Sequence, residues 1–250
     1  MFTRLILFQI LICIFNFTAP SVQASFNCVS KLKIDAKGLS SMISSEGTTF
    51  SKEVMKKGFA PRGSAVATSS GKLAQNGIRN IIHAASGSMA MDGEEFVPTL
   101  ESVALSVKNS LSLASKLNHQ SIAIPFIGGK IFLQRIGVSS QTLASAIVDS
   151  IQAGKNELTV KLIAFSDEDY FLFKTIIQNK SITDIAVLQG SILDFKLHGC
   201  SAIINAANME VIFGGGISGA IANATENERE INEEAQMIIH EFYLGSTKKK

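Results

Sequence analysis

Two glycine-rich loops are the parts of this sequence best suited to bind a ligand through the backbone. One reads FGGGIS, residues 213–218, just before a helix predicted to start near Ile217. The other reads GGKIF, residues 128–132, directly after an apolar strand. Bare glycine N–H groups and a helix start both favour an anion, and two such loops suit the two sides of a diphosphate. A plain tight turn is the commoner explanation of either loop alone. Neither has P-loop or G-x-G-x-x-G spacing, so nothing supports hydride transfer.

Apolar periodicity predicts the elements that position these loops. Strands are predicted at 63–68, 78–84, 121–127, 158–165, 184–189 and 200–206. Helices are predicted at 100–117, around 143–151, at 168–178 and at 228–243. This alternation favours an α/β fold, a mixed or parallel sheet with helices on both faces. In such folds ligands lie beyond the carboxyl ends of the strands.

The N-terminus predicts export. Arg4 precedes the apolar run LILFQILICIF, and Val22 and Ala24 occupy the small-residue positions of a cleavage site. We therefore expect a signal peptide over 1–24 and a secreted or periplasmic protein. A single membrane anchor is the alternative, but the run is too short to span a bilayer comfortably. The mature protein is expected to have no membrane partner.

Composition excludes several function classes. Cleavage after Ala24 removes one charged residue, Arg4, and lowers the formal net charge from +2 to +1. No basic surface for a specific nucleic acid is expected, and the lysines of 246–250 form a solvated tail. Cys28 and Cys200 would remain, which allows one disulfide but makes a zinc site improbable. No metal or cofactor is predicted.

The two loops and their flanking strands resemble a macro domain, the ADP-ribose-binding module. The resemblance rests first on AIINAAN and FGGGISGAI, within 202–221, and on SIAIPFIGGKIF at 121–132. It extends to LQGSI at 188–192, GSAVAT at 63–68, IIHAASGS at 81–88 and LIAFSDEDYFLFK at 162–174. It implies a three-layer α/β/α fold, with ADP-ribose or an ADP-ribosylated protein as partner.

The order of these elements differs from the usual macro domain, in which LQGSI and NAAN come first. Here they come last, which predicts a circularly permuted domain with its core at 63–245. An N-terminal extension at 25–62, with a strand over 29–34 and a helix over 49–57, would complete it. The alternative is a tandem, with a degenerate first copy over 25–180 and a truncated second copy.

The resemblance also implies roles for individual residues. Asn208 would contact the distal ribose, and it is the best candidate for a catalytic role. Asn205 would hold the loop, Phe132 would pack on the ribose and Phe165 would stack on adenine; the common alternative for Phe165 is the core. The remaining predicted ligand-binding residues are Gly128, Gly129, Lys130, Ile131, Gly190, Ser191, Ile192, Gly214, Gly215, Gly216, Ile217 and Ser218.

Departures from the family pattern weaken two of these predictions, the selectivity for adenine and the hydrolase activity. Ser191 and Ser218 stand where the family often has aspartates, which bond adenine and activate water respectively. Ala222 replaces a histidine of some members, and His83 is interpreted as structural. A neutral serine without a base is a poor proton acceptor. We therefore rank ADP-ribose binding first, ADP-ribosyl hydrolysis second and a degenerate interaction scaffold third.

Overall fold

The computed structural model of this chain describes residues 58–88 and 93–244. All of them belong to one compact unit, Lys56–Lys250. The predicted signal peptide, the strand over 29–34, the helix over 49–57 and the basic tail lie outside the described residues.

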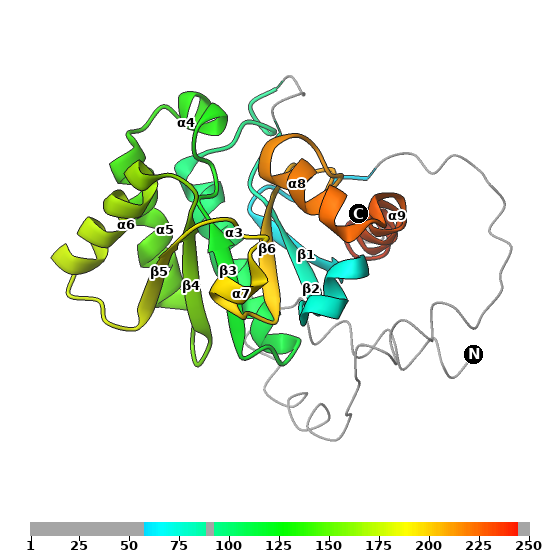
Figure 1. The fold of residues 1–250 in the computed structure, drawn as a ribbon. Coiled ribbons are helices and arrows are strands. Elements are labelled where there is room, and N and C mark those ends of the chain that lie inside the picture. Colours follow the sequence, from blue (N-terminus) through cyan, green and yellow to red (C-terminus); the bar gives the residue numbers. More distant parts are fainter. Residues whose placement is uncertain (1–57, 89–92, 245–250) are drawn as a thin grey trace, which may run out of the picture. The chain divides into compact units, whose positions relative to one another are not determined.

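The unit is built around a six-stranded sheet in the order β1-β2-β6-β3-β4-β5 (Figure 1). The strands are β1 Ser64–Ser69, β2 Asn80–Ala85, β3 Ser121–Pro125, β4 Thr159–Ala164, β5 Ile185–Gln189 and β6 Ala202–Ala207. β1 runs antiparallel to β2, and the other neighbouring pairs are parallel. The predicted mixed sheet is confirmed.

β6 occupies the middle of this sheet although it comes last among the strands in sequence. Ile204 pairs with Ile82 of β2, and Ala202 pairs with Ile122 of β3. β6 reads AIINAA and is buried at five of its six positions, as a strand covered on both faces must be. The C-terminal segment therefore completes the sheet that the earlier strands begin.

Helices cover both faces, so the fold has three layers, α/β/α (Figure 1). One layer holds α3 Leu100–Lys116, α5 Ser140–Gly154 and α6 Asp167–Asn179. Their apolar faces pack on the sheet through residues such as Val107, Ile147 and Phe173. Thr99, Ser139 and Ser166 cap these helices by accepting backbone N–H bonds.

The second layer is built mainly from the C-terminal part of the chain. It contains η2 Gly71–Asn76, α7 Phe195–His198, α8 Gly216–Thr225 and α9 Glu228–Ile239. A π-helical turn, η3 His240–Leu244, continues α9. Ile221 and Ile231 pack on Ile203 and Ala123 of the sheet, and Ala235 and Ile239 pack on Val66. A short helix, α4 Ile131–Ile136, follows the loop after β3.

Candidate functional site

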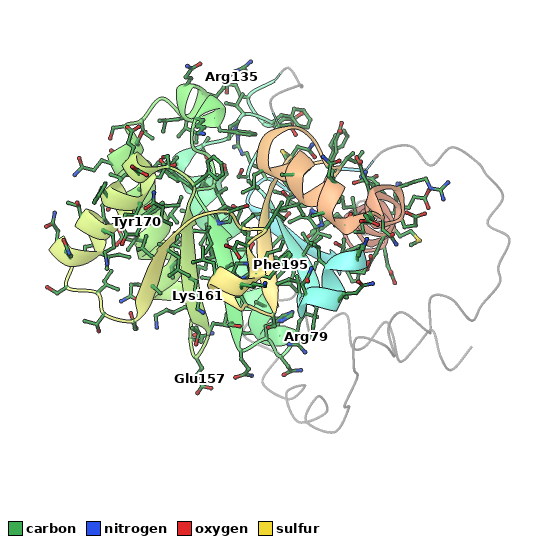
Figure 2. All side chains as sticks on the ribbon, viewed as in Figure 1. Arg79, Arg135, Glu157, Lys161, Tyr170 and Phe195 are labelled. Carbon is green, nitrogen blue, oxygen red and sulfur yellow. The ribbon has the colours of Figure 1, made fainter. Side chains whose placement is uncertain are left out.

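The predicted site residues gather at one edge of the sheet. β2, β6, β3, β4 and β5 are parallel, so their carboxyl ends share that edge. The NAAN loop follows β6, the Gly128–Lys130 loop follows β3, Phe165 follows β4 and Gly190 follows β5. α4 and the start of α8 lie along this edge in Figure 1. In Figure 2, Arg135 of α4 lies there, whereas Arg79 and Glu157 lie at the opposite edge.

The first glycine loop presents free backbone donors. Gly214, Gly215 and Gly216 are exposed, and a Cβ added at any of them would meet nothing within 4 Å. In the described residues, no acceptor engages the amides of Gly215, Gly216 and Ile217, the first donors of α8. Gly214 differs, because its N–H donates to the Ser218 hydroxyl at 3.2 Å. Three of the four predicted amides are therefore open to an anion.

A buried hydrogen-bond network supports this loop from below. The Asn205 side-chain nitrogen donates to Ser218 Oγ at 3.2 Å and to His83 Nδ1 at 3.1 Å. Because Nδ1 accepts, neutral His83 carries its proton on Nε2 and donates to Thr68 Oγ1 at 2.9 Å. Asn205 and His83 are fully buried, and burial lowers the pKa of His83 to about 3. Asn205 Oδ1 has no hydrogen-bond partner in the described part of the chain.

The chain between β6 and α8 is held by side chains at both ends. Asn208 Nδ2 donates to the Ile212 carbonyl at 3.0 Å, and its Oδ1 accepts from the Ile212 amide at 3.2 Å. The Phe213 amide donates to Asn232 Oδ1 of α9 at 3.0 Å. Between them Val211 is buried with φ +52, a strained conformation for a β-branched residue. Any ribose contact by Asn208 would have to use its remaining N–H and lone pairs.

The second loop combines two glycines with a lysine in a glycine-like conformation. Gly128 has φ +77, and a Cβ added there would lie 3.2 Å from side-chain atoms of both Val103 and Ile136, so a side chain would be crowded. Lys130 has φ +55 and ψ −112, a region that residues with a Cβ rarely adopt. Phe132, on the first turn of α4, is half-buried, and Ile131 starts that helix.

Phe165 is the most exposed large apolar residue of the described chain. Its side chain is 74% exposed directly after β4, so the alternative placement in the core is wrong. The Lys130 ammonium lies 5.8 Å from the centre of its ring. An exposed ring at a strand end leaves a face on which a flat group could stack.

The segment that follows β5, the outermost strand on this side, holds the last of the predicted site residues. Gly190 has φ +152, a conformation that strains residues with a side chain, and a Cβ there would lie 2.7 Å from Leu197 Cδ2. Ser191 Oγ accepts from the Leu193 amide at 3.1 Å, and Ile192 is buried. Nearby, the Gln189 side chain donates to Asp167 in the first turn of α6. Asp167, Glu168 and Asp169 occupy that turn, where carboxylates favour the helix dipole.

Among residues 58–88 and 93–244, the arrangement offers binding groups and no base that contacts Ser218. Ser218 Oγ accepts two N–H bonds, and the His83 ring bonds to Asn205 and Thr68 rather than to this hydroxyl. No carboxylate or imidazole of the described residues hydrogen-bonds Ser218. The described part of the chain also contains no cluster of acidic, histidine or cysteine residues suited to a metal ion. Among the same residues, no helix is long and apolar enough to cross a membrane.

Other polar clusters lie away from this edge. At the opposite edge, Arg79 donates to His119 Nδ1 at 3.0 Å, and His119 Nε2 donates to Asn80. Burial and the Arg79 charge lower the pKa of His119 to about 4. Cys200, just before β6, is a buried free thiol, while Cys28 lies outside the described residues. The Arg79 and His119 bonds link residues at the starts of β2 and β3.

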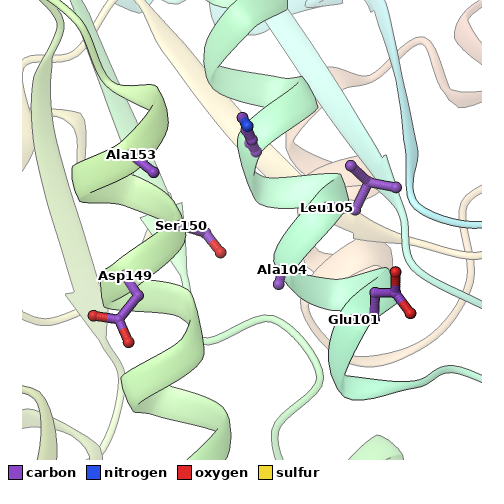
Figure 3. Close-up of a pocket in the computed structure, with 7 residues that line it drawn as sticks. Glu101, Ala104, Leu105, Asp149, Ser150 and Ala153 are labelled. Atoms are coloured by element: carbon purple, nitrogen blue, oxygen red, sulfur yellow. The ribbon is translucent and has the colours of Figure 1, made fainter.

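A shallow depression of about 350 Å³ lies between α3 and α5 (Figure 3). Its lining includes Ala104 and Leu105 from one helix and Asp149 and Ser150 from the other. It lies in the helical layer and includes none of the glycine-loop residues. The convergent donors lie at the carboxyl edge of the sheet, outside this depression.

Comparison with known proteins supports a macro domain. Residues 36–143 match the family described as Macro domain, whose members generally bind ADP-ribose. The matched range holds β1 to β3 and the Gly128–Lys130 loop, and ends before β4. An uncharacterized protein of Sulfurisphaera tokodaii is 28% identical over 127 residues, covering 51% of this chain and 65% of its own length. The chain thus spans less than two thirds of that relative.

Proposed function

We propose that this chain binds ADP-ribose, or a related nucleotide diphosphate-ribose, across the carboxyl edge of the sheet. The diphosphate lies between the amides of Gly215–Ile217 and those of the Gly128–Lys130 loop. The base stacks on Phe165. The observation that carries the proposal is the convergence of free α8 amides, a second glycine loop and an exposed ring on neighbouring strands.

The spacing along the edge supports this orientation. The two loops follow adjacent strands, β6 and β3, and Phe165 follows β4, the next strand along. Neighbouring strands are roughly 4.8 Å apart, so the ring lies two strands, or roughly 10 Å, from the first loop. A diphosphate joined through a ribose to a base spans a comparable length. The family match adds ADP-ribose as the expected chemistry.

The proposal is binding rather than hydrolysis. A hydrolase needs a group that takes a proton from water or from a ribose hydroxyl. Ser218 is neutral and already accepts two hydrogen bonds. Burial keeps His83 neutral, but its lone acceptor nitrogen faces Asn205. Within the described residues the supporting observations are those of binding.

We further propose that the domain is circularly permuted. β5 and β6 come from the C-terminal part, yet they share one sheet with β1 to β4 and bring the NAAN loop beside the second glycine loop. The family match favours the tandem alternative at one point, because it begins at residue 36. Deletion of residues 185–250 distinguishes the permuted domain from the tandem. The permuted domain should then fail to fold, whereas a tandem should keep a folded first copy over residues 25–180.

Export is the remaining part of the proposal, supported by Arg4, the apolar run and the small residues before Ser25. The exported protein would meet its ligand in a periplasm or outside the cell. N-terminal sequencing of protein recovered after secretory expression should give Ser25 as the first residue. An intact Met1 would contradict export by this route.

The test of binding uses Gly215, whose φ of −80 and empty surroundings tolerate a side chain. Gly215→Glu places a carboxylate where the phosphate would lie, and it should abolish ADP-ribose binding in calorimetry. Ala153→Glu is the control for an added carboxylate, since Ala153 is exposed on α5, away from both glycine loops. Equal ADP-ribose affinity of wild type and Gly215→Glu would overturn the proposed site and leave the scaffold alternative.

A further inference from the structure

The backbone of Lys130 has a conformation that favours glycine. With φ +55 and ψ −112 it follows Gly128 and Gly129, and its Cβ adds strain that a glycine would not have. Strained residues of this kind persist where the surrounding structure or function requires them. A function of the lysine side chain would account for keeping this strained residue in place of glycine.

The lysine side chain is directed to the aromatic ring and not to an acid. Its Nζ lies 5.8 Å from the centre of the Phe165 ring, within cation–π range. No carboxylate of residues 58–88 or 93–244 forms an ion pair with it, although three acidic residues start the neighbouring helix α6. The charge thus rests on the ring face that a base would need.

We propose that Lys130 is a specificity-determining residue of this nucleotide site. Its ammonium covers Phe165 when the site is empty and moves to the diphosphate when a base takes its place on the ring. The inference rests on the proposed function and goes further. A base can stack on Phe165 only after the Lys130 ammonium has left the ring to bind a phosphate. The preferred ligand class is a nucleoside carrying a diphosphate, and a nucleoside without phosphate must compete with the cation.

The ammonium position can be measured without any nucleotide. Ring currents of Phe165 should shift the Lys130 ε-CH₂ signals upfield in NMR spectra, and Phe165→Leu should remove that shift. Adding pyrophosphate, which has no base, should move the Lys130 signals toward ordinary values. Lys174, whose ammonium lies 6.0 Å from the Tyr170 ring on α6, is the matched control and should not respond. If the chemical shifts of Lys130 change neither in Phe165→Leu nor on addition of pyrophosphate, the inference is overturned.

Calorimetry tests the selectivity. Lys130→Gln keeps the strained backbone but removes the charge, and it should weaken ADP-ribose binding roughly tenfold, as expected for one charged hydrogen bond. Adenosine affinity should stay unchanged or rise, and Lys130→Arg should restore ADP-ribose binding. Equal losses for ADP-ribose and adenosine, or no loss, would overturn the inference. Failure of the wild type to bind ADP-ribose would instead overturn the proposed function, and the pyrophosphate titration would then decide on Lys130 alone.

Discussion

The side-chain nitrogen of Asn205 in β6 donates to the Ser218 hydroxyl across 3.2 Å, joining this strand to the first turn of α8. Ser218 in turn receives the Gly214 amide. The glycine loop is therefore positioned by a buried bond between the sheet and the helix that begins after the loop. Its open amides stay aimed at one place because their neighbours are already bonded.

Asn205→Ala should lower the free energy of unfolding and loosen the loop. It leaves the buried His83 Nδ1 without a donor, and such a loss costs about 1–3 kcal/mol. Urea denaturation measures this change, and ADP-ribose affinity should fall with it. Ser218→Ala, which keeps the Asn205–His83 bond, should cost less. A larger loss of stability in Ser218→Ala than in Asn205→Ala would contradict this account of the network.

Phe165→Ala should separate binding from stability. The side chain is 74% exposed, so its removal should scarcely change the unfolding midpoint. Loss of base stacking should cost about 1–3 kcal/mol of ADP-ribose binding. Phe173, a fully buried residue of α6, is the matched control: Phe173→Ala should lose about 3–5 kcal/mol of stability. A strongly destabilised Phe165→Ala protein would show that this ring is a packing residue after all.

Lys130→Gly should stabilise the protein while weakening ligand binding. Glycine adopts φ +55 without a Cβ penalty, so relief of strain should raise the free energy of unfolding by about 1 kcal/mol. Lys130→Gln keeps the strain and should leave stability nearly unchanged. Thermal unfolding compares the three proteins. Destabilisation by glycine would mean that the lysine stem stabilises the loop more than its backbone strains it.

Stability should decrease on acidification because of His83. Burial lowers its pKa from the ordinary 6.5 to about 3, so between these values the unfolded chain binds a proton that the folded chain does not. The contribution of His83 to the free energy of unfolding should therefore level off above pH 6.5 and fall below it, by up to about 1.4 kcal/mol per pH unit. His119, whose pKa is lowered to about 4, acts in the same direction.

His83→Gln isolates that contribution, because glutamine does not titrate. Urea denaturation at about pH 7.5 and about pH 5 should give a smaller difference for the variant than for the wild type. Identical differences would show that His83 is not the buried neutral group described here.

Strong periodicity made most elements predictable. The apolar spacing from Val103 to Leu111 gave α3, and the β-branched runs gave all six strands within about two residues. α4 and α7 were missed because six and four residues are too few to show a helical period. The helix predicted at 228–243 ends as α9 at Ile239 and continues as a π turn, which periodicity does not distinguish.

The site was predictable in its residue types but not in its bonds. Bare glycines predicted open amides at Gly215 and Gly216, yet the bond that occupies the Gly214 amide depends on a side chain four residues later. Exposure of Phe165 was open in sequence, because a phenylalanine at a strand end is most often buried. The strain at Lys130 has no sequence signal except that a lysine follows two glycines.

Calorimetric titration of the purified protein with ADP-ribose, with ADP and AMP as comparisons, tests the central claim most directly. The account predicts saturable ADP-ribose binding, weaker binding of AMP and no binding by Gly215→Glu. Absence of heat from all three ligands with the folded wild-type protein would contradict it and would make the glycine loops plain turns of an interaction scaffold.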